Sequence, residues 1–210
     1  MTAFAFPGDL ELLADLTHAS HIPRAALLAL GMGEDEVNNL CFGDPTGSLA
    51  SVCDVEIHEA PGEQMASDWT RDPRIDEDVV IFAQDGTGSM IGLWRGEAGA
   101  DSDRSPSSFP VVFLGSEGML AVMAPDLAAF AYLLACGNGT YNWACLMQDP
   151  AGPEGYLVAR ATPARLEVLH AELAAAFAPG VDAARASAAL DAARALTPRF
   201  AQEIMATISG

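Results

Sequence analysis

Three glycines near the middle of the sequence have a spacing that could support cofactor chemistry. Gly86, Gly88 and Gly92 follow the pattern G-x-G-x-x-x-G. A dinucleotide-binding fingerprint requires G-x-G-x-x-G at the start of a helix, because the helix N-terminus then faces the pyrophosphate. Here an apolar run typical of a strand follows the glycines. The pattern therefore predicts a turn, and we expect no bound cofactor.

A pair of histidines near the N-terminus could bind a metal ion. His18 and His21 lie three residues apart and could ligate zinc through their imidazoles. The spacing offers no evident third ligand, and histidines at a helix end commonly serve as local caps or lie in solvent. We expect no metal site.

One serine lies in a context that partly matches a nucleophile elbow. Ser116 follows Gly115 and precedes Gly118, but G-x-S-x-G requires a glycine two residues before the serine, and position 114 is leucine. His58 and His170 could act as bases, although no pattern places either beside a nucleophile. The sequence predicts that the protein is not an enzyme, with a hydrolase that uses His58 or His170 as an alternative.

The charge composition excludes several classes of function. All ten basic residues are arginine, so the chain has no lysine for a P-loop, a pyridoxal Schiff base or a kinase strand. The 29 acids give a formal net charge of −19, which repels nucleic acid and attracts basic protein surfaces. We expect a basic protein partner, and the acids that could contact it are Asp76, Glu77, Asp78 and Glu117.

The cysteines and the apolar segments indicate the cellular compartment. Cys41, Cys53, Cys136 and Cys145 have no C-x-x-C spacing, and we expect reduced thiols that fill core volume. The N-terminus has no basic region, and the longest apolar run, 127–137, is about half a membrane span. The sequence predicts a cytoplasmic protein with no membrane contact.

Strand patterns dominate the middle of the chain and predict an antiparallel sheet. The apolar runs 79–83 and 90–94 flank Asp85-Gly86-Thr87-Gly88, a strong hairpin signal in which Asp85, Gly86 and Gly88 form the turn. A second strand pair covers 111–114 and 119–123, and Pro125-Asp126 opens a helix. The apolar-rich segment with Val52, Val55 and Ile57 also resembles a strand. This order predicts an α+β fold.

Both ends of the chain have helical patterns. Asp9 can cap a first helix, and Pro23 starts a second that ends at Gly31. The tail 163–210 contains 16 alanines and has a net charge of only −1, which predicts a domain 1–150 with a helical extension 163–210 packed on it. In the tail we expect one helix that starts at Thr162-Pro163 and buries Leu173 and Phe177, and another that starts at Thr197-Pro198.

The strand block resembles a known superfamily. Residues 79–94, VVIFAQDGTGSMIGLW, look like the hairpin of the SUKH superfamily, written pFA-x-DGSG-x-x-x-x-LW. Residues 110–118 are similar to its strand PVVFL…EG, and residues 125–136 resemble its following helix S-L-x-E-F-L-x-L-L. The resemblance covers 77–137, under a third of the chain, weakens in 20–60 and is absent in 150–210.

The resemblance implies an α+β fold and a role without catalysis. SUKH proteins include immunity proteins that neutralise secreted toxins, often nucleases, and fungal regulators of cell-wall assembly. Their contact residues follow no fixed motif, so no site residue is transferred. We therefore expect a cytosolic immunity protein that binds a basic toxin. The alternative from another class is a structural or assembly protein that self-associates through its C-terminal helices.

Overall fold

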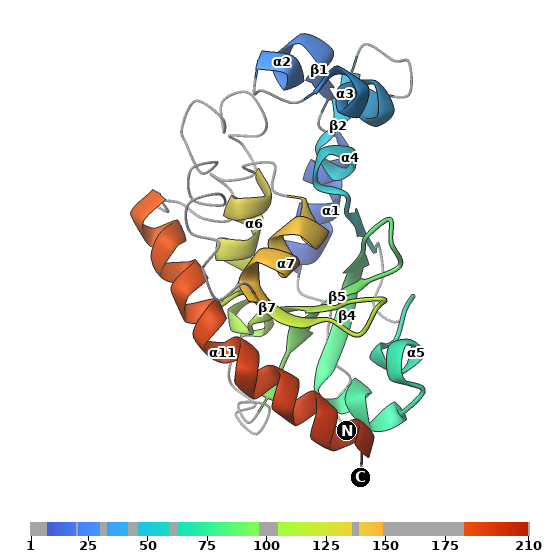
Figure 1. Cartoon of the computed structure of the whole chain (residues 1–210), viewed down its shortest axis with the longest axis vertical. Helices are drawn as coiled ribbons and strands as arrows, with labels where there is room; N and C mark the ends of the chain where they lie inside the picture. Colours follow the sequence, from blue (N-terminus) through green and yellow to red (C-terminus); the bar gives the residue numbers. More distant parts are fainter. Residues whose placement is uncertain are drawn as a thin grey trace.

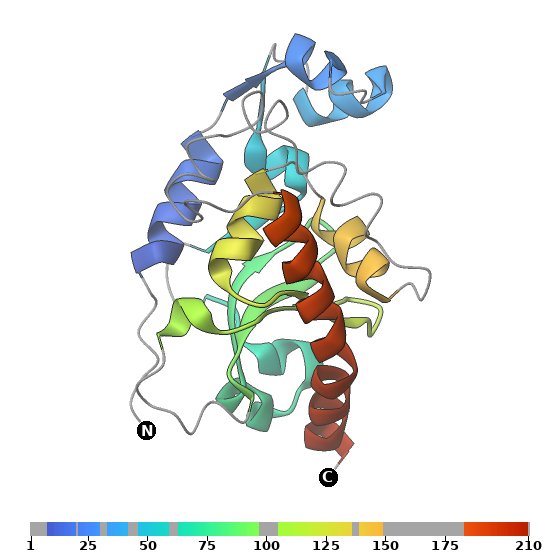
Figure 2. The same cartoon turned by 90° about the vertical axis from the view of Figure 1, so that its left-hand side faces the viewer.

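A computed structural model gives the fold of the chain, in which antiparallel strands pack between helices (Figures 1 and 2). It describes residues 8–19, 21–29, 33–41, 46–58, 63–96, 105–135, 139–148 and 183–209. No helix in these ranges is long and apolar enough to cross a membrane.

A five-stranded antiparallel sheet forms the centre of the molecule, in the order β3-β4-β5-β6-β7. Each strand pairs with its neighbour in sequence, so the sheet is a meander. Every residue of β5, β6 and β7 is buried, which shows that both faces of this part of the sheet are covered. The predicted α+β class is confirmed. The strands are β3 (Glu56–Ile57), β4 (Val79–Gln84), β5 (Met90–Trp94), β6 (Val111–Leu114) and β7 (Leu120–Ala124).

The predicted β4–β5 hairpin is confirmed, and its glycines have distinct steric roles. Gln84 pairs with Met90 across the turn, and Gly88 has a φ of +81°, which an L side chain rarely adopts. Gly92 lies opposite a register shift in β4, where a Cβ atom would lie 2.8 Å from Val79 Cγ1. The spacing of these glycines therefore follows from a turn and a close approach of two strands.

The N-terminal segment contains three helices and a small second sheet. Helix α1 begins at Gly8, one residue before the predicted cap Asp9. Pro23 ends the short strand β1 instead of starting a helix, and α2 begins at the next residue. The elements are α1 (Gly8–Ala19), β1 (His21–Pro23), α2 (Arg24–Ala29), α3 (Glu34–Cys41) and β2 (Thr46–Ser48), with β1 antiparallel to β2.

The expected strand with Val52, Val55 and Ile57 is wrong at Val52, which lies in a helix. Residues 49–53 form a short helix, α4 (Leu49–Cys53), and only Glu56–Ile57 are a strand. Asp54 ends α4 with a φ of +51°, its N–H donates to Ser51 O, and the N–H of Val55 donates to Ala50 O. This pair of bonds is a Schellman motif. A five-residue helix is too short to show a helical periodicity in the sequence.

Two short helical elements lie between β3 and β4, and two follow directly after β7. Asp126 Oδ1 accepts from the N–H of Ala129 at 2.8 Å, so the helix predicted at Pro125-Asp126 is confirmed. Phe130 on α6 lies edge-on to Phe82, 5.9 Å between ring centroids, and stacks on Trp143 of α7 at 5.3 Å. These contacts join the helices to the sheet. The elements are α5 (Ala66–Thr70), the 3-10 helix η1 (Pro73–Glu77), α6 (Leu127–Ala135) and α7 (Thr140–Gln148).

The C-terminal part of the chain is one continuous helix, α11 (Ala183–Ser209). The predicted helix start at Thr197-Pro198 is wrong, because the proline lies inside α11. Its missing N–H costs one helical hydrogen bond, but buried residues on both sides of the proline, Leu190, Phe200 and Ile204, hold the helix in place. The predicted burial of Leu173 and Phe177 and the boundary at 150–163 lie outside the described residues.

Helix α11 and α7 cover the outer edge of the sheet at β7 (Figures 1 and 2). The hydroxyl of Thr197 accepts from the N–H of Val122 at 3.0 Å and donates to Ala193 O. Gln148 Nε2 donates to Leu120 O at 2.6 Å. Side chains therefore satisfy backbone groups that a further strand would otherwise pair.

Substitution of Gly88 by alanine tests the turn. A side chain at this φ costs about 1–2 kcal/mol, so Gly88→Ala is expected to lower the melting temperature by several degrees in calorimetry. Gly139→Ala is the control, because a Cβ there meets no atom within 4 Å. Equal melting temperatures for the two variants would contradict the turn geometry.

Substitution of Thr197 by valine tests the contact between α11 and the sheet edge. The change leaves the Val122 N–H without its acceptor, and we expect a loss of about 1–3 kcal/mol in the free energy of unfolding. Thr207→Val is a matched control, since the Thr207 hydroxyl donates only within α11, to Glu203 O. Urea denaturation of both variants measures the difference, and a similar small loss in each would refute the bridging role of Thr197.

Candidate functional site

The two hairpin turns of the sheet lie side by side at one end of the strands. In a meander, the β4–β5 turn (85–89) and the β6–β7 turn (115–119) leave the sheet at the same end, because the β5–β6 connection is at the other. The N–H of Ser116 donates to Ser89 Oγ at 3.1 Å, which joins the two turns directly. Trp69 on α5 donates its Nε1–H to Gly115 O at 2.7 Å and fixes the second turn.

A buried carboxylate organises the first turn. Asp85 is only 4% exposed. Its Oδ1 accepts from the N–H of Thr87 at 2.9 Å, the hydroxyl of Thr87 at 2.6 Å and the N–H of Ser89 at 2.9 Å. Its Oδ2 is also buried and has no hydrogen-bond partner among the described residues. One oxygen therefore builds the turn, and the other has its hydrogen-bonding capacity unused.

Helix α7 brings an aromatic side chain to the joined turns. The hydroxyl of Thr140 donates to Asp54 O at 2.9 Å, which fixes the start of α7 near the turns. Next to it, Tyr141 is 37% exposed. The pKa of Tyr141 is raised above its usual value. The main cause is Cys145, through its electrostatic interaction and a hydrogen bond with the phenol, and Glu117, burial and Asp85 add to it. Because Thr140 binds Asp54 and Asp54 accepts from Gly86, Tyr141 starts from a backbone position close to the first turn.

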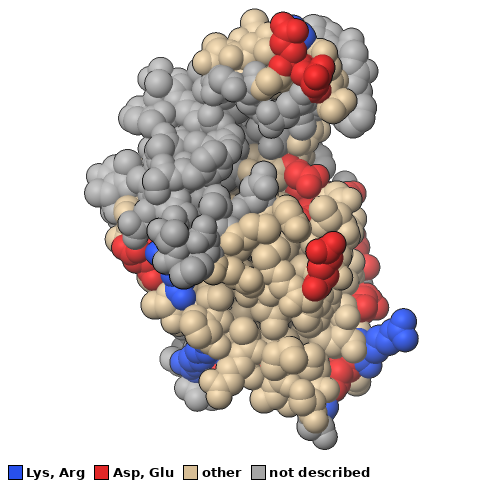
Figure 3. Space-filling view, viewed as in Figure 1, with Lys and Arg blue, Asp and Glu red and all other residues tan. Residues whose placement is uncertain are grey.

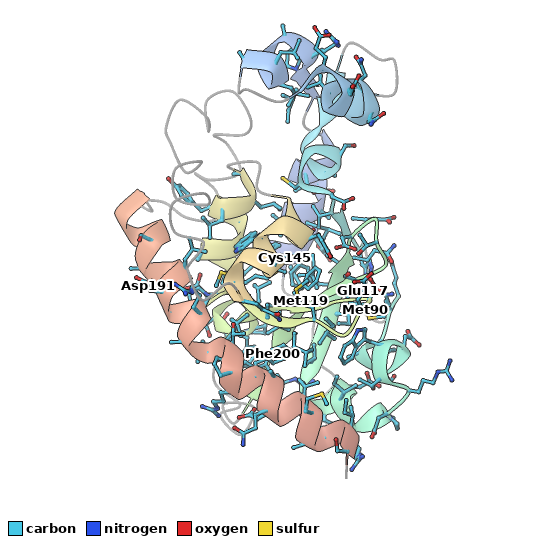
Figure 4. All side chains as sticks on the ribbon, viewed as in Figure 1. Met90, Glu117, Met119, Cys145, Asp191 and Phe200 are labelled. Atoms are coloured by element: carbon cyan, nitrogen blue, oxygen red, sulfur yellow. The ribbon has the colours of Figure 1, made fainter. Side chains whose placement is uncertain are left out.

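We call this group of side chains the turn rim. Asp54 accepts from the N–H of Gly86 at 3.2 Å, and Glu56 accepts from Gln84 at the end of β4. Figure 4 shows Glu117 beside Met90 at the turn end of the strands, on the opposite side of the view from Asp191 on α11, with Cys145 of α7 between them. The turn rim consists of the exposed acids Asp54, Glu56 and Glu117, the buried Asp85, and Tyr141.

Charge is distributed unevenly over the described surface. In Figure 3, acidic side chains lie along the right-hand edge of the view with arginines at its lower end, further acids lie at the top and the left, and the centre of the face is largely uncharged. A groove of about 540 Å³ lies between α7, β7 and α11, and Arg194 is the charged residue in its lining. The groove therefore does not extend the acidic surface.

The four acids expected to contact a partner are divided between the two ends of the sheet. Glu117 is exposed in the β6–β7 turn, whereas Asp76, Glu77 and Asp78 precede β4 at the opposite end. Asp76 accepts from the N–H of Ser67 at 2.8 Å and thus ties η1 to α5. Glu77 is exposed. The four residues therefore do not form one surface.

Asp78 is half-buried beside α11. Burial raises the pKa of the Asp78 carboxyl, Glu203 and Glu77 raise it further, and Arg95 opposes them. Nearby, Arg199 pairs with Glu203 at 2.7 Å and lies 5.7 Å from the ring centroid of Trp94. Asp78 therefore belongs to the packing between η1 and α11.

Of the histidines considered for catalysis and metal binding, the structure describes the side chain of His58. His58 is buried, and burial lowers its pKa against the opposing charges of Glu63 and Glu56. No hydrogen bond among the described residues joins the His58 ring to a serine, threonine or cysteine. His18 falls in α1 and His21 in β1, their side chains lie outside the description, and His170 is outside the described residues. The described part of the chain contains no group of three His, Cys, Asp or Glu that could hold a metal ion.

Two of the four cysteines follow the prediction of buried thiols. Cys41 and Cys53 are buried, and the Cys53 thiol donates to Leu134 O at 3.2 Å. Cys145 is exposed, so the expectation that it fills core volume is wrong. Its position on the outer side of α7, one turn after Tyr141, explains the difference. Cys136 lies outside the described residues.

Comparison with known proteins returned no match to a family model, a curated protein or a solved structure.

The sequence contained part of the signal for the turn rim. The sequence identifies Asp85 as a turn residue and gives Glu117 as an expected contact residue, and the meander order places the two turns together. Asp54 and Tyr141 come from segments without a motif, and only the tertiary structure brings them to the turns.

Two substitutions of Asp85 separate its two oxygens. Asp85→Ala removes the acceptor of three hydrogen bonds, and we expect a loss of at least about 2 kcal/mol in the free energy of unfolding. Asp85→Asn retains Oδ1, so its loss is expected to stay below about 1 kcal/mol. Urea denaturation gives both values. Equal losses would show that the carboxylate does not build the turn through Oδ1.

Proposed function

We propose that the chain is a binding protein of SUKH type, without catalytic activity, that captures a basic protein, and that it acts as an immunity protein against a toxin. The observation that carries this proposal is the turn rim, where Asp54, Glu56 and Glu117 are exposed around the buried Asp85. Carboxylates at the edge of an interface steer a partner of opposite charge and select against acidic proteins.

The order of the elements supports the SUKH part of the proposal. The β4–β5 hairpin, the β6–β7 pair and α6 follow one another in the order of the segments that resemble the superfamily. The wider charge supports the basic partner, because residues 1–162 contain 24 acids and 6 arginines.

The geometry of α11 bears on the alternative of self-association. The apolar face that could join two copies includes Leu190, Phe200 and Ile204, and these side chains are buried within the same chain. Phe200 lies 5.2 Å from Trp94 between ring centroids. This packing favours capture of another protein through the turn rim over assembly through the C-terminal helix.

Affinity capture followed by binding kinetics tests the proposed function. The immobilised chain is exposed to a lysate of its source cell, and bound proteins are identified by mass spectrometry. We expect a protein with a basic domain whose association rate falls steeply between about 20 and 500 mM salt, as the screening length shortens from roughly 20 to 4 Å. A captured partner that is acidic, or an association rate independent of salt, would contradict the proposal.

A further inference from the structure

We propose that the turn rim receives an arginine side chain, whose guanidinium binds to Asp85 and Glu117 and stacks on Tyr141. This inference rests on the proposed function in one respect, since the arginine belongs to the basic partner. It goes further by naming the group that is recognised and the place where it binds.

One oxygen of the buried Asp85 carboxylate is without a hydrogen bond among the described residues. A carboxylate oxygen that is buried without a hydrogen bond carries a desolvation penalty that nothing offsets. Oδ1 of Asp85 already accepts three hydrogen bonds, whereas Oδ2 has no partner among the described residues. A cationic donor that reaches Oδ2 would relieve this penalty, so the site favours binding of a positive charge.

The side chains near Asp85 favour arginine over lysine. Glu117 adds an exposed carboxylate next to Ser116, which binds Ser89 of the first turn, and Tyr141 follows Thr140, which binds Asp54. A guanidinium is planar, carries five N–H donors and stacks on aromatic rings, whereas an ammonium is a compact and strongly hydrated charge. Two carboxylates beside an aromatic ring therefore favour arginine over lysine.

The burial of Oδ2 restricts access to the site. Oδ2 has almost no exposed surface, so a neighbouring side chain must move to admit the guanidinium. Tyr141 is more than a third exposed and lies in the first turn of α7. The Tyr141 ring can therefore change its rotamer to meet a ligand while Thr140 still holds α7 to Asp54.

Small cations test the site without any knowledge of the partner. The ¹⁵N-labelled protein is titrated with N-ethylguanidinium chloride at constant ionic strength, and amide shifts are followed by NMR. We expect saturable shifts at Thr87, Ser89 and Ser116, and an affinity for n-propylammonium that is weaker by about two- to fivefold through loss of stacking. Shifts spread equally over all exposed acids, or equal affinities for the two cations, would overturn the proposal.

Three variants link the shifts to the named side chains. Asp85→Asn and Glu117→Gln are each expected to weaken binding of N-ethylguanidinium, and Glu117→Gln is informative even if the Asp85 variant is unstable, because Glu117 is exposed. Glu34→Gln, at an exposed acid on α3, is the matched control and should leave the affinity unchanged. Unchanged affinity in both rim variants would refute the site.

The outcome separates this inference from the proposed function. If N-ethylguanidinium binds at the turn rim but capture yields no basic protein, the site is supported and the proposed function fails. If a basic protein is captured and its affinity is the same for the wild type, Asp85→Asn and Glu117→Gln, the proposed function is supported and the arginine site fails.

Discussion

The carboxylate of Asp85 is the interaction on which the central part of this structure depends. Its Oδ1 gathers the backbone of Thr87 and Ser89 into a tight turn, and this turn sets the register of β4 against β5. The hydroxyl of Ser89 then accepts from the N–H of Ser116 and so fixes the position of the next turn. A single buried acid thus positions two hairpins, and its second oxygen is buried without a hydrogen bond among the described residues.

Local signals in the sequence were sufficient to predict this part of the fold. Strand runs alternated with turns that contain aspartate and glycine, and each hairpin closes over a few residues, so no long-range information was needed to pair β4 with β5 or β6 with β7. The same signals identified Asp85 as a turn residue. They did not show that Asp76 would be used within the chain, because its partner Ser67 lies on another element.

Elements defined by tertiary contacts were not predictable in the same way. Thr197-Pro198 has the composition of a helix start, yet α11 continues through it because the Thr197 hydroxyl binds Val122 on β7 and Phe200 packs against Trp94. Likewise Tyr141 lies in a helix without any sequence motif. Its position near the turns depends on the hydrogen bond from the Thr140 hydroxyl to Asp54 O, and these two residues are 86 positions apart in the chain. Packing therefore overrode local propensity at these places.

The contact of α11 with the edge strand β7 affects folding during synthesis, because β7 is made long before α11. Val122 and Thr197 are 75 positions apart, and a ribosome adds about 5–20 residues per second. The meander from β4 to β7 can therefore emerge and pair several seconds before α11 exists. During that interval the edge of β7 exposes backbone groups that match any other strand, including one from a neighbouring nascent chain. Slow translation between β7 and α11 would thus favour misassembly, and chaperone binding to this edge would protect the unfinished sheet.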